Sequence, residues 1–294
     1  TDWDTAMDAV VGKVRELLDG QGPSAIGFYT TGQLFIEDYY TLGLIAHGGI
    51  GTNHVAGNTR LGTATAAAAL KESLACDGQP GSYTDVDHAD VIALFGHNVA
   101  ETQSVLWTRI LDRLAGPNPP KLVCVDPRLT PVAKEATVHL APRPGTNVML
   151  MNALLHEIVS NGWYDEEYVA AHAVGFEELQ AQLKDCPPET AAEVCDVPVE
   201  QIREAARLIG TAERLLSTVL QGFYQSHQAT AAACLVNDLH LLRGMLGRPG
   251  AGVLQMNGQP SAQNTRETGA DGDLPGMRNW DNREHIEELA RIWN

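Results

Sequence analysis

Short apolar runs that end in Gly, Asn or Pro alternate along this chain with helical patterns, and this alternation constrains the fold most. Three runs, Ser24–Thr30, Asp90–Phe95 and Lys121–Val125, have the apolar density of buried strands. Between the last two, apolar residues recur at helical spacing over residues 105–114, and Gly116 ends the pattern. The sequence therefore predicts a strand–helix–strand unit with parallel strands.

The same alternation continues toward the C-terminus. A helix is expected over residues 147–161, with Thr146 as its cap, and a buried strand over residues 215–220. Ser226 is the expected cap of a long apolar helix that reaches Leu246. Residues 258–279 are rich in Gly, Pro, Asn and Asp and predict an ordered loop. Strands that alternate with helices indicate an α/β fold with a largely parallel sheet.

Composition narrows the possible partners. The 294 residues are 44% apolar and carry a formal net charge of -17, which opposes binding to nucleic acid or an anionic membrane. The five cysteines are widely spaced, so neither a disulfide framework nor a zinc or iron–sulfur cluster is indicated.

No secretory leader or long apolar run is present, and a cytoplasmic location is expected. His47 and His54 have no Cys or carboxylate at the usual offsets, so loop histidines are expected there rather than zinc ligands.

Polar residues follow two of the predicted strands. Gly96 and Asn98 come after the first, and Asp126 and Arg128 come after the second. In an open parallel sheet, ligands bind at the carboxyl ends of the strands. Gly96 permits close approach of a ligand group such as a phosphate, and Asn98 supplies a donor and an acceptor. Asp126 could accept two hydrogen bonds from guanine, and Arg128 could stack on the base or pair with phosphate. The alternative is that Asn98 and Asp126 only form turns or cap helices.

Six motifs taken together resemble a known family. They are Asn58-Thr59-Arg60-Leu61, Gly96-x-Asn98-x-x-Glu101, Val125-Asp126-Pro127-Arg128, Pro144-Gly145-Thr146-Asn147, Gly247-Arg248-Pro249-Gly250-Ala251-Gly252-Val253 and Gly258-Gln259-Pro260. Their order and spacing resemble the bis-molybdopterin guanine dinucleotide oxidoreductases of the dimethyl sulfoxide reductase family, in the nitrate reductase and formate dehydrogenase branch. The resemblance runs nearly end to end.

The resemblance implies cofactor contacts at specific residues. The cofactor's phosphates and ribose would be contacted by Gly96, Asn98 and Glu101, and its guanine by Asp126, Arg128, Gly145, Thr146 and Asn147. The inner crevice nearer the pterin would be lined by Gln221, Gly222 and Gln225, with Gln259 as a further cofactor contact. His97 stands where that loop more usually has Ser.

The resemblance also bears on the reaction. Arg266 would face an anionic substrate near the metal, which favours a nitrate reductase-like parent; the alternative is a loop arginine paired with Glu267 or Asp271. Gly62 stands where many relatives place a Cys or selenocysteine metal ligand, so no metal ligand is assigned in this chain. Molybdenum would then be held by pterin dithiolene sulfurs. Cys76, fourteen residues away, is not a convincing replacement.

The predicted organisation has two domains. Residues 1–57 and 259–294 form a discontinuous α/β domain, into which residues 58–258 are inserted as a three-layer, Rossmann-like domain that binds one or two molybdopterin guanine dinucleotides. The chain resembles the central part of a larger enzyme, without its N-terminal iron–sulfur domain and its C-terminal pterin-covering domain. Those domains or an electron-transfer protein are the expected partners, and the isolated chain is expected to be weak or inactive. The alternatives are a formate dehydrogenase-like parent, with His54 or Arg60 orienting substrate, and a non-catalytic carrier or storage module for the pterin nucleotide.

Overall fold

The computed structural model describes residues 1–272 and 274–293 and divides the chain into two compact units. We call residues Ala64–Gly258 the sheet unit, and Thr1–Thr63 with Gln259–Asn294 the terminal unit. Helix α3 (Thr59–Leu74) contains the boundary between them.

The sheet unit contains five parallel strands in the order β5-β4-β3-β6-β7. Its strands are β3 (Val91–Phe95), β4 (Lys121–Val125), β5 (Val138–Leu140), β6 (Leu215–Val219) and β7 (Gly252–Gln255). All five residues of β3 and of β6 are buried, which explains why both strands are continuous apolar or small-residue runs. The predicted α/β class and parallel sheet are confirmed.

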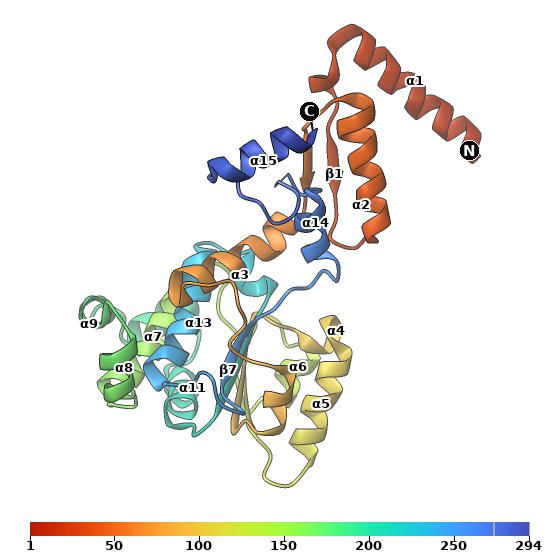
Figure 1. Ribbon diagram of the computed structural model, residues 1–294. Helices are drawn as coiled ribbons and strands as arrows, with labels where there is room; N and C mark the ends of the chain where they lie inside the picture. The colour runs from red at the N-terminus through yellow and green to blue at the C-terminus, as the bar shows by residue number, and fades with distance from the viewer. Residues whose placement is uncertain (273, 294) are drawn as a thin grey trace. The chain divides into compact units, whose positions relative to one another are not determined.

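Helices cover both faces of this sheet, as Figure 1 shows. One face carries α4 (Val99–Thr102), α5 (Ser104–Ala115) and α6 (Pro131–Glu135). The other carries α7 (Asn147–Ser160), α11 (Val199–Thr211) and α13 (Ala229–Arg243). The remaining elements are the 3-10 helix η3 (Tyr83–Asp87), α8 (Glu166–His172), α9 (Phe176–Leu183), α10 (Pro188–Cys195) and α12 (Gln221–Tyr224).

The chain order creates a switch point in the sheet. The chain runs outward from β3 to β4 and β5, then returns to place β6 on the opposite side of β3. Ligands of open α/β sheets bind outside the carboxyl ends of the strands at such a point. A ligand site is therefore expected at the carboxyl ends of β3 and β6.

The terminal unit has a small parallel sheet of two strands, β1 (Phe28–Thr30) and β2 (Val55–Gly57). Its other elements are α1 (Trp3–Gln21), the 3-10 helix η1 (Pro23–Ala25), α2 (Ile36–Gly43), the π-helix η2 (Leu44–Ile50), α14 (Ala262–Thr268) and α15 (Arg283–Trp293). The strand predicted over Ser24–Thr30 is shorter than expected, because Pro23 begins a 3-10 turn. It is also not fully buried, since Tyr29 is 71% exposed.

Two local predictions near the C-terminus are wrong. Ser226 does not cap α13, because Gln228 occupies the cap position with a left-handed backbone and the Ser226 hydroxyl donates to Phe223 O instead. The predicted loop over residues 258–279 contains helix α14, whose end is set by Gly269 in the left-handed conformation.

Candidate functional site

Two glycines face each other at the switch point. Gly96 follows β3 with a φ of +59°, and Gly222 follows β6. The Gly222 N–H donates to Gly96 O over 3.0 Å. A Cβ built on Gly96 would lie 2.7 Å from Gly222 Cα, and one built on Gly222 would lie 2.6 Å from Gly96 Cα. Glycine is therefore required at both positions for the two loops to approach each other this closely.

Asn98, beside this contact, has polar atoms that no protein group satisfies. Its side chain is 7% exposed, and both Oδ1 and Nδ2 are buried without a hydrogen-bond partner. Asn98 holds the N-cap position of α4, but its side chain makes no capping bond. An unmet buried polar group costs about 1–3 kcal/mol, so this amide is suited to a ligand that supplies both a donor and an acceptor. Glu101, one turn later, is exposed, and its N–H donates to Asn98 O.

Asp126 follows the adjacent strand β4 and is 6% exposed. Its Oδ1 accepts a hydrogen bond from the Arg128 N–H over 2.8 Å, which is the turn-forming role that the sequence left open. The exposed Arg128 side chain places Nε 3.7 Å from the same oxygen. A carboxylate oxygen has two lone pairs, so Oδ2 and part of Oδ1 retain acceptor capacity for a ligand.

The start of α7 returns to the same edge of the sheet. Asn147 is 6% exposed, and its Nδ2 donates to Gly222 O and to Ser226 Oγ over 3.0 and 3.1 Å. Thr146 is at the cap position, but its hydroxyl donates to Arg143 O and makes no cap bond with the helix. Gly145 is exposed, with a φ of +90° and no atom near a built Cβ. Asn147 thus holds the loop after β6, while the exposed backbone before α7 stays accessible.

The loop after β6 is anchored by residues that the sequence did not single out. Tyr224 Oη, buried at the end of α12, lies 2.8 Å from Val219 O and 2.9 Å from Gln255 Oε1 on β7. Burial raises the pKa of Tyr224 well above its ordinary value, so the hydroxyl keeps its proton. Half-buried Gln221 has its Oε1 buried without a partner, and Gln225 is exposed. A sequence signal for Tyr224 and Gln255 was lacking, because their pairing depends on the strand order.

The remaining predicted site residues belong to the terminal unit. Gln259 is half-buried, and its Nε2 donates to Asn58 Oδ1 and Thr31 Oγ1 over 3.0 and 3.3 Å. Arg266 is half-buried on α14, so it is a helical residue. The carboxylate of Glu267 accepts from Gln263 and Asn264.

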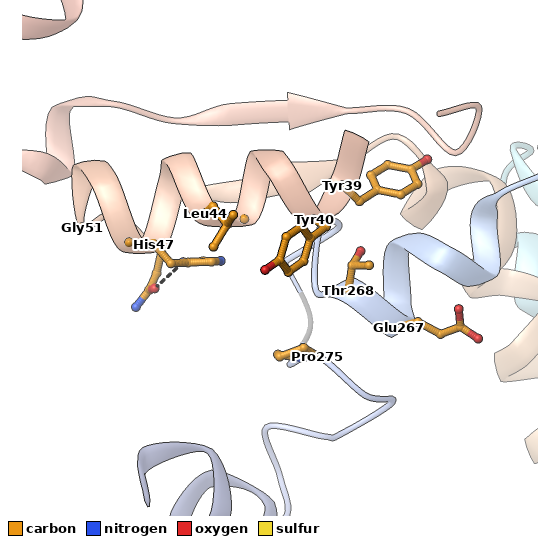
Figure 2. A pocket seen from close by; sticks show the side chains of 11 residues that line it. Tyr39, Tyr40, Leu44, His47, Gly51, Glu267, Thr268 and Pro275 are labelled. Atoms are coloured by element: carbon orange, nitrogen blue, oxygen red, sulfur yellow. Dashed lines mark hydrogen bonds between the residues drawn. The ribbon is translucent and has the colours of Figure 1, made fainter. Parts of the chain in front are cut away.

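The terminal unit also contains a pocket of about 660 Å³ between α2–η2 and residues Glu267, Thr268 and Pro275 (Figure 2). Tyr40, Leu44 and Pro275 give it an apolar wall, and Glu267 adds a carboxylate. His47, on the π-helix, hydrogen-bonds Asn53 through Nδ1. The described lining residues include no lysine or arginine, so this pocket does not favour a small anion.

No group of three or more His, Cys, Asp or Glu residues that could hold a metal ion occurs within residues 1–272 and 274–293. Gly62 is buried on α3 and has no donor atom. Cys124, Cys186 and Cys195 are buried free thiols, and burial raises the pKa of Cys124 to about 12. Cys76 is exposed.

The paired glycines and the polar strand ends thus lie at the switch point of a parallel sheet, where open α/β proteins bind their ligands. The family profile described as molybdopterin oxidoreductase matches residues 1–290. The chain belongs to the molybdopterin oxidoreductase family, whose members use molybdenum and a pterin cofactor.

Curated relatives agree with this assignment. The chain is 34% identical to a nitrate reductase of Synechocystis over 293 residues, which is 99% of this chain and 41% of that protein. It is 34% identical to a periplasmic nitrate reductase of Desulfovibrio desulfuricans over 302 residues, 99% of this chain and 40% of that protein. It is 29% identical to formate dehydrogenase H of Escherichia coli over 295 residues, 99% of this chain and 41% of that protein. The chain thus spans about two fifths of the length of these relatives.

Acetylene hydratase from Pelobacter acetylenicus has a similar fold, with a TM-score of 0.64 at 23% identity, over 86% of this chain and 34% of that chain. That similarity concerns the fold alone.

No helix in the described part of the chain is both long and apolar enough to cross a bilayer.

Proposed function

We propose that the carboxyl edge of the sheet unit binds the nucleotide end of a molybdopterin guanine dinucleotide, in a protein whose full-length form reduces nitrate by oxygen-atom transfer. The observation that carries this proposal is the buried amide of Asn98, whose polar atoms have no protein partner, beside the Gly96–Gly222 contact. Leaving such groups unmet costs about 1–3 kcal/mol each, which a bound phosphate or ribose would offset. The chain's own residues thus fit a nucleotide at this edge.

Further groups at this edge suit the parts of a guanine nucleotide. The carboxylate of Asp126 accepts the N1–H and the exocyclic amine of guanine, and the exposed guanidinium of Arg128 stacks on the base or pairs with phosphate. The free N–H groups of the fourteen-residue helix α7 favour an anion near Thr146. Gln221 and Gln225, after β6, would contact the part of the cofactor nearer the pterin.

The cofactor would supply two-electron redox chemistry at molybdenum, held by its own dithiolene sulfurs because Gly62 has no donor atom. The residues of this chain bind and orient the cofactor. Arg266 would attract an anionic substrate, a role that suits nitrate and formate alike. The similarity to nitrate reductases supports nitrate.

Two alternatives have specific support. The similarity to formate dehydrogenase H supports a formate-oxidising parent, in which His54 or Arg60 orients the substrate. Glycine at position 62 supports a carrier or storage module for the pterin nucleotide.

We propose a cytoplasmic location for the protein, with an electron-transfer partner or further domains completing the enzyme.

The nucleotide site is tested by calorimetric titration of the 294-residue chain with GDP. We expect saturable one-site binding that is weakened in Asp126→Asn, which loses a carboxylate acceptor, and unchanged in Asp112→Asn, an exposed control on α5. Binding of ADP as tightly as GDP would contradict the guanine assignment.

The reaction is tested on the full-length protein with reduced viologen and nitrate, or oxidised viologen and formate. Arg266→Gln should raise the KM for nitrate at least about tenfold, an effect of about 1.4 kcal/mol, and Arg266→Lys less. Formate turnover without nitrate turnover would select the first alternative. Tight cofactor binding without turnover, even after Gly62→Cys, would select the carrier.

A further inference from the structure

His97 lies between Gly96 and Asn98 and is 1% exposed. Its Nδ1 is 2.6 Å from Thr218 Oγ1 on β6, and its Nε2 is 2.7 Å from Gln103 Oε1. The Gln103 Nε2 donates to Asn257 O over 3.2 Å, which fixes the orientation of the amide and makes Oε1 an acceptor. His97 must then donate through Nε2–H and accept from the Thr218 hydroxyl through Nδ1.

This arrangement joins three strand ends by side chains. His97 belongs to the loop after β3, Thr218 is near the carboxyl end of β6, and Asn257 follows β7. The imidazole uses both ring nitrogens within the protein. It therefore contributes no contact to a ligand, yet it fixes the backbone on both sides of itself, where Gly96 and Asn98 lie.

We propose that His97, in its neutral Nε2–H form, is a positioning residue that holds the Gly96–Asn98 loop against β6 and so presents the Asn98 amide to the nucleotide. This inference rests on the proposed nucleotide site and deepens it. The bonds from Thr218 and to Gln103 keep the imidazole in one tautomer and one orientation. Loss of either bond releases the loop that carries Asn98.

A second buried histidine shows what is particular to His97. His240 on α13 is 0% exposed, and its Nδ1 is 3.0 Å from Met245 O. Burial lowers the pKa of both histidines to about 4. His240 lies in the last turn of α13, ahead of the amino end of β7, so it does not touch the strand ends of the site. His97 and His240 are thus both buried and neutral, and only His97 hydrogen-bonds across the switch point, to Thr218 on β6 and to Gln103.

The test removes the hydroxyl that His97 accepts from. Thr218→Val keeps the shape and loses the donor, and Thr218→Ser restores the donor in a smaller side chain. We expect Thr218→Val to weaken GDP binding about tenfold, which corresponds to about 1.4 kcal/mol, and Thr218→Ser by less than about threefold, because serine restores the hydroxyl donor. His240→Gln serves as the control that destabilises a buried histidine site and leaves the GDP affinity unchanged.

Two readouts separate positioning from general stability. Nitrogen-15 NMR of the imidazole should report the Nε2–H tautomer of His97 in the wild type and in Thr218→Val, because Gln103 Oε1 still accepts, and a changed Nδ1 shift in Thr218→Val, where the bond from the hydroxyl is lost. Hydrogen exchange of residues 96–101 should become faster in Thr218→Val and stay unchanged in His240→Gln. Wild-type protection of this loop in Thr218→Val, or an Nδ1–H tautomer in the wild type, would overturn the proposal.

The GDP arm distinguishes the two proposals. If the wild-type chain does not bind GDP, the proposed nucleotide site fails, while the exchange and NMR results still decide the role of His97. If the wild type binds GDP and Thr218→Val binds it equally tightly, the role of His97 in the site fails and the nucleotide site stands.

Discussion

The close contact between Gly96 and Gly222 makes a quantitative prediction about unfolding. Alanine at position 96 has two costs, a left-handed backbone at φ +59° and a Cβ 2.7 Å from the Gly222 and Phe223 backbone. The backbone cost is roughly 1–2 kcal/mol, and forcing apart packed backbone costs roughly 1–3 kcal/mol. Gly96→Ala should therefore lower the free energy of unfolding by about 2–5 kcal/mol.

Two other glycines separate these costs. Gly222 does not have a positive φ, so Gly222→Ala has only the steric cost of about 1–3 kcal/mol. Gly162 has a φ of +67° and no atom within 4 Å of a built Cβ, so Gly162→Ala has only the backbone cost of about 1–2 kcal/mol. Gly96→Ala should be the most destabilising of the three.

Urea unfolding of the three variants, followed by circular dichroism, gives the three free energies. Hydrogen exchange of β3 and β6 peptides assigns the loss to the sheet unit. If Gly96→Ala were no more destabilising than Gly162→Ala, the backbone contact at the switch point would be refuted. In that case the loops after β3 and β6 would lie farther apart than described.

Three further predictions concern buried polar groups. Asn98→Leu should leave the free energy of unfolding unchanged or raise it by up to about 2 kcal/mol, because the lost polar atoms have no partner. The same variant should bind GDP at least about tenfold more weakly in a titration. A large loss of stability in Asn98→Leu would contradict this prediction. Tyr224→Phe should cost about 1–3 kcal/mol in urea unfolding, because it leaves a buried acceptor unmet, and a neutral result would count against the anchoring of α12. Burial raises the pKa of Asp238 to about 7, so the contribution of Asp238 to stability falls as the pH rises from about 4 to about 7. Burial lowers the pKa of His97 and of His240 to about 4, so the contributions of these two histidines fall as the pH decreases from about 6.5 to about 4. Asp238→Asn should therefore steepen the rise of unfolding free energy between about pH 4.5 and 6.5 by about 1.4 kcal/mol per pH unit, measured by urea unfolding across that range, and an unchanged slope would show that Asp238 ionises normally.

The sequence predicted the elements whose signal is local. The runs that became β3, β4 and β6 are buried on both faces, so their apolar residues are continuous. Helix α7 was predicted within a residue of its end, because Thr146 and Gly162 mark its two ends. Each of these signals is contained in a short stretch of neighbouring residues.

Features that depend on contacts between distant residues could not be predicted in the same way. Ser226 has the chemistry of a helix cap, but its hydroxyl is used by Phe223 O and by Asn147, which approaches only in the folded sheet. The pairing of Gly96 with Gly222 depends on β6 lying beside β3, which the strand order determines. The sequence named Gly96, Gly222 and Asn98 as site residues through motifs, and the structure supplies the contact that places them at one edge.

The role of His97 was left open at the sequence level for the same reason. A lone histidine after a strand has many possible partners, and Thr218 and Gln103 become its partners only through the sheet and the turn between α4 and α5. The terminal unit was harder to predict. The helical signal of Ala262–Thr268 is short and lies among Gly, Pro and Asn residues, whose local preference is for turns.

The central claim is that the carboxyl edge of the five-stranded sheet binds the nucleotide of a molybdenum cofactor. The most direct measurement is the cofactor content of full-length protein purified from a host that makes molybdopterin guanine dinucleotide, by metal analysis and by mass spectrometry of the nucleotide released with acid. We predict molybdenum together with GMP in the wild type, and a strong reduction of both in Gly96→Ala relative to Gly162→Ala. Wild-type protein that contains neither guanine nucleotide nor pterin, or a Gly96→Ala variant with a full complement of both, would contradict the account.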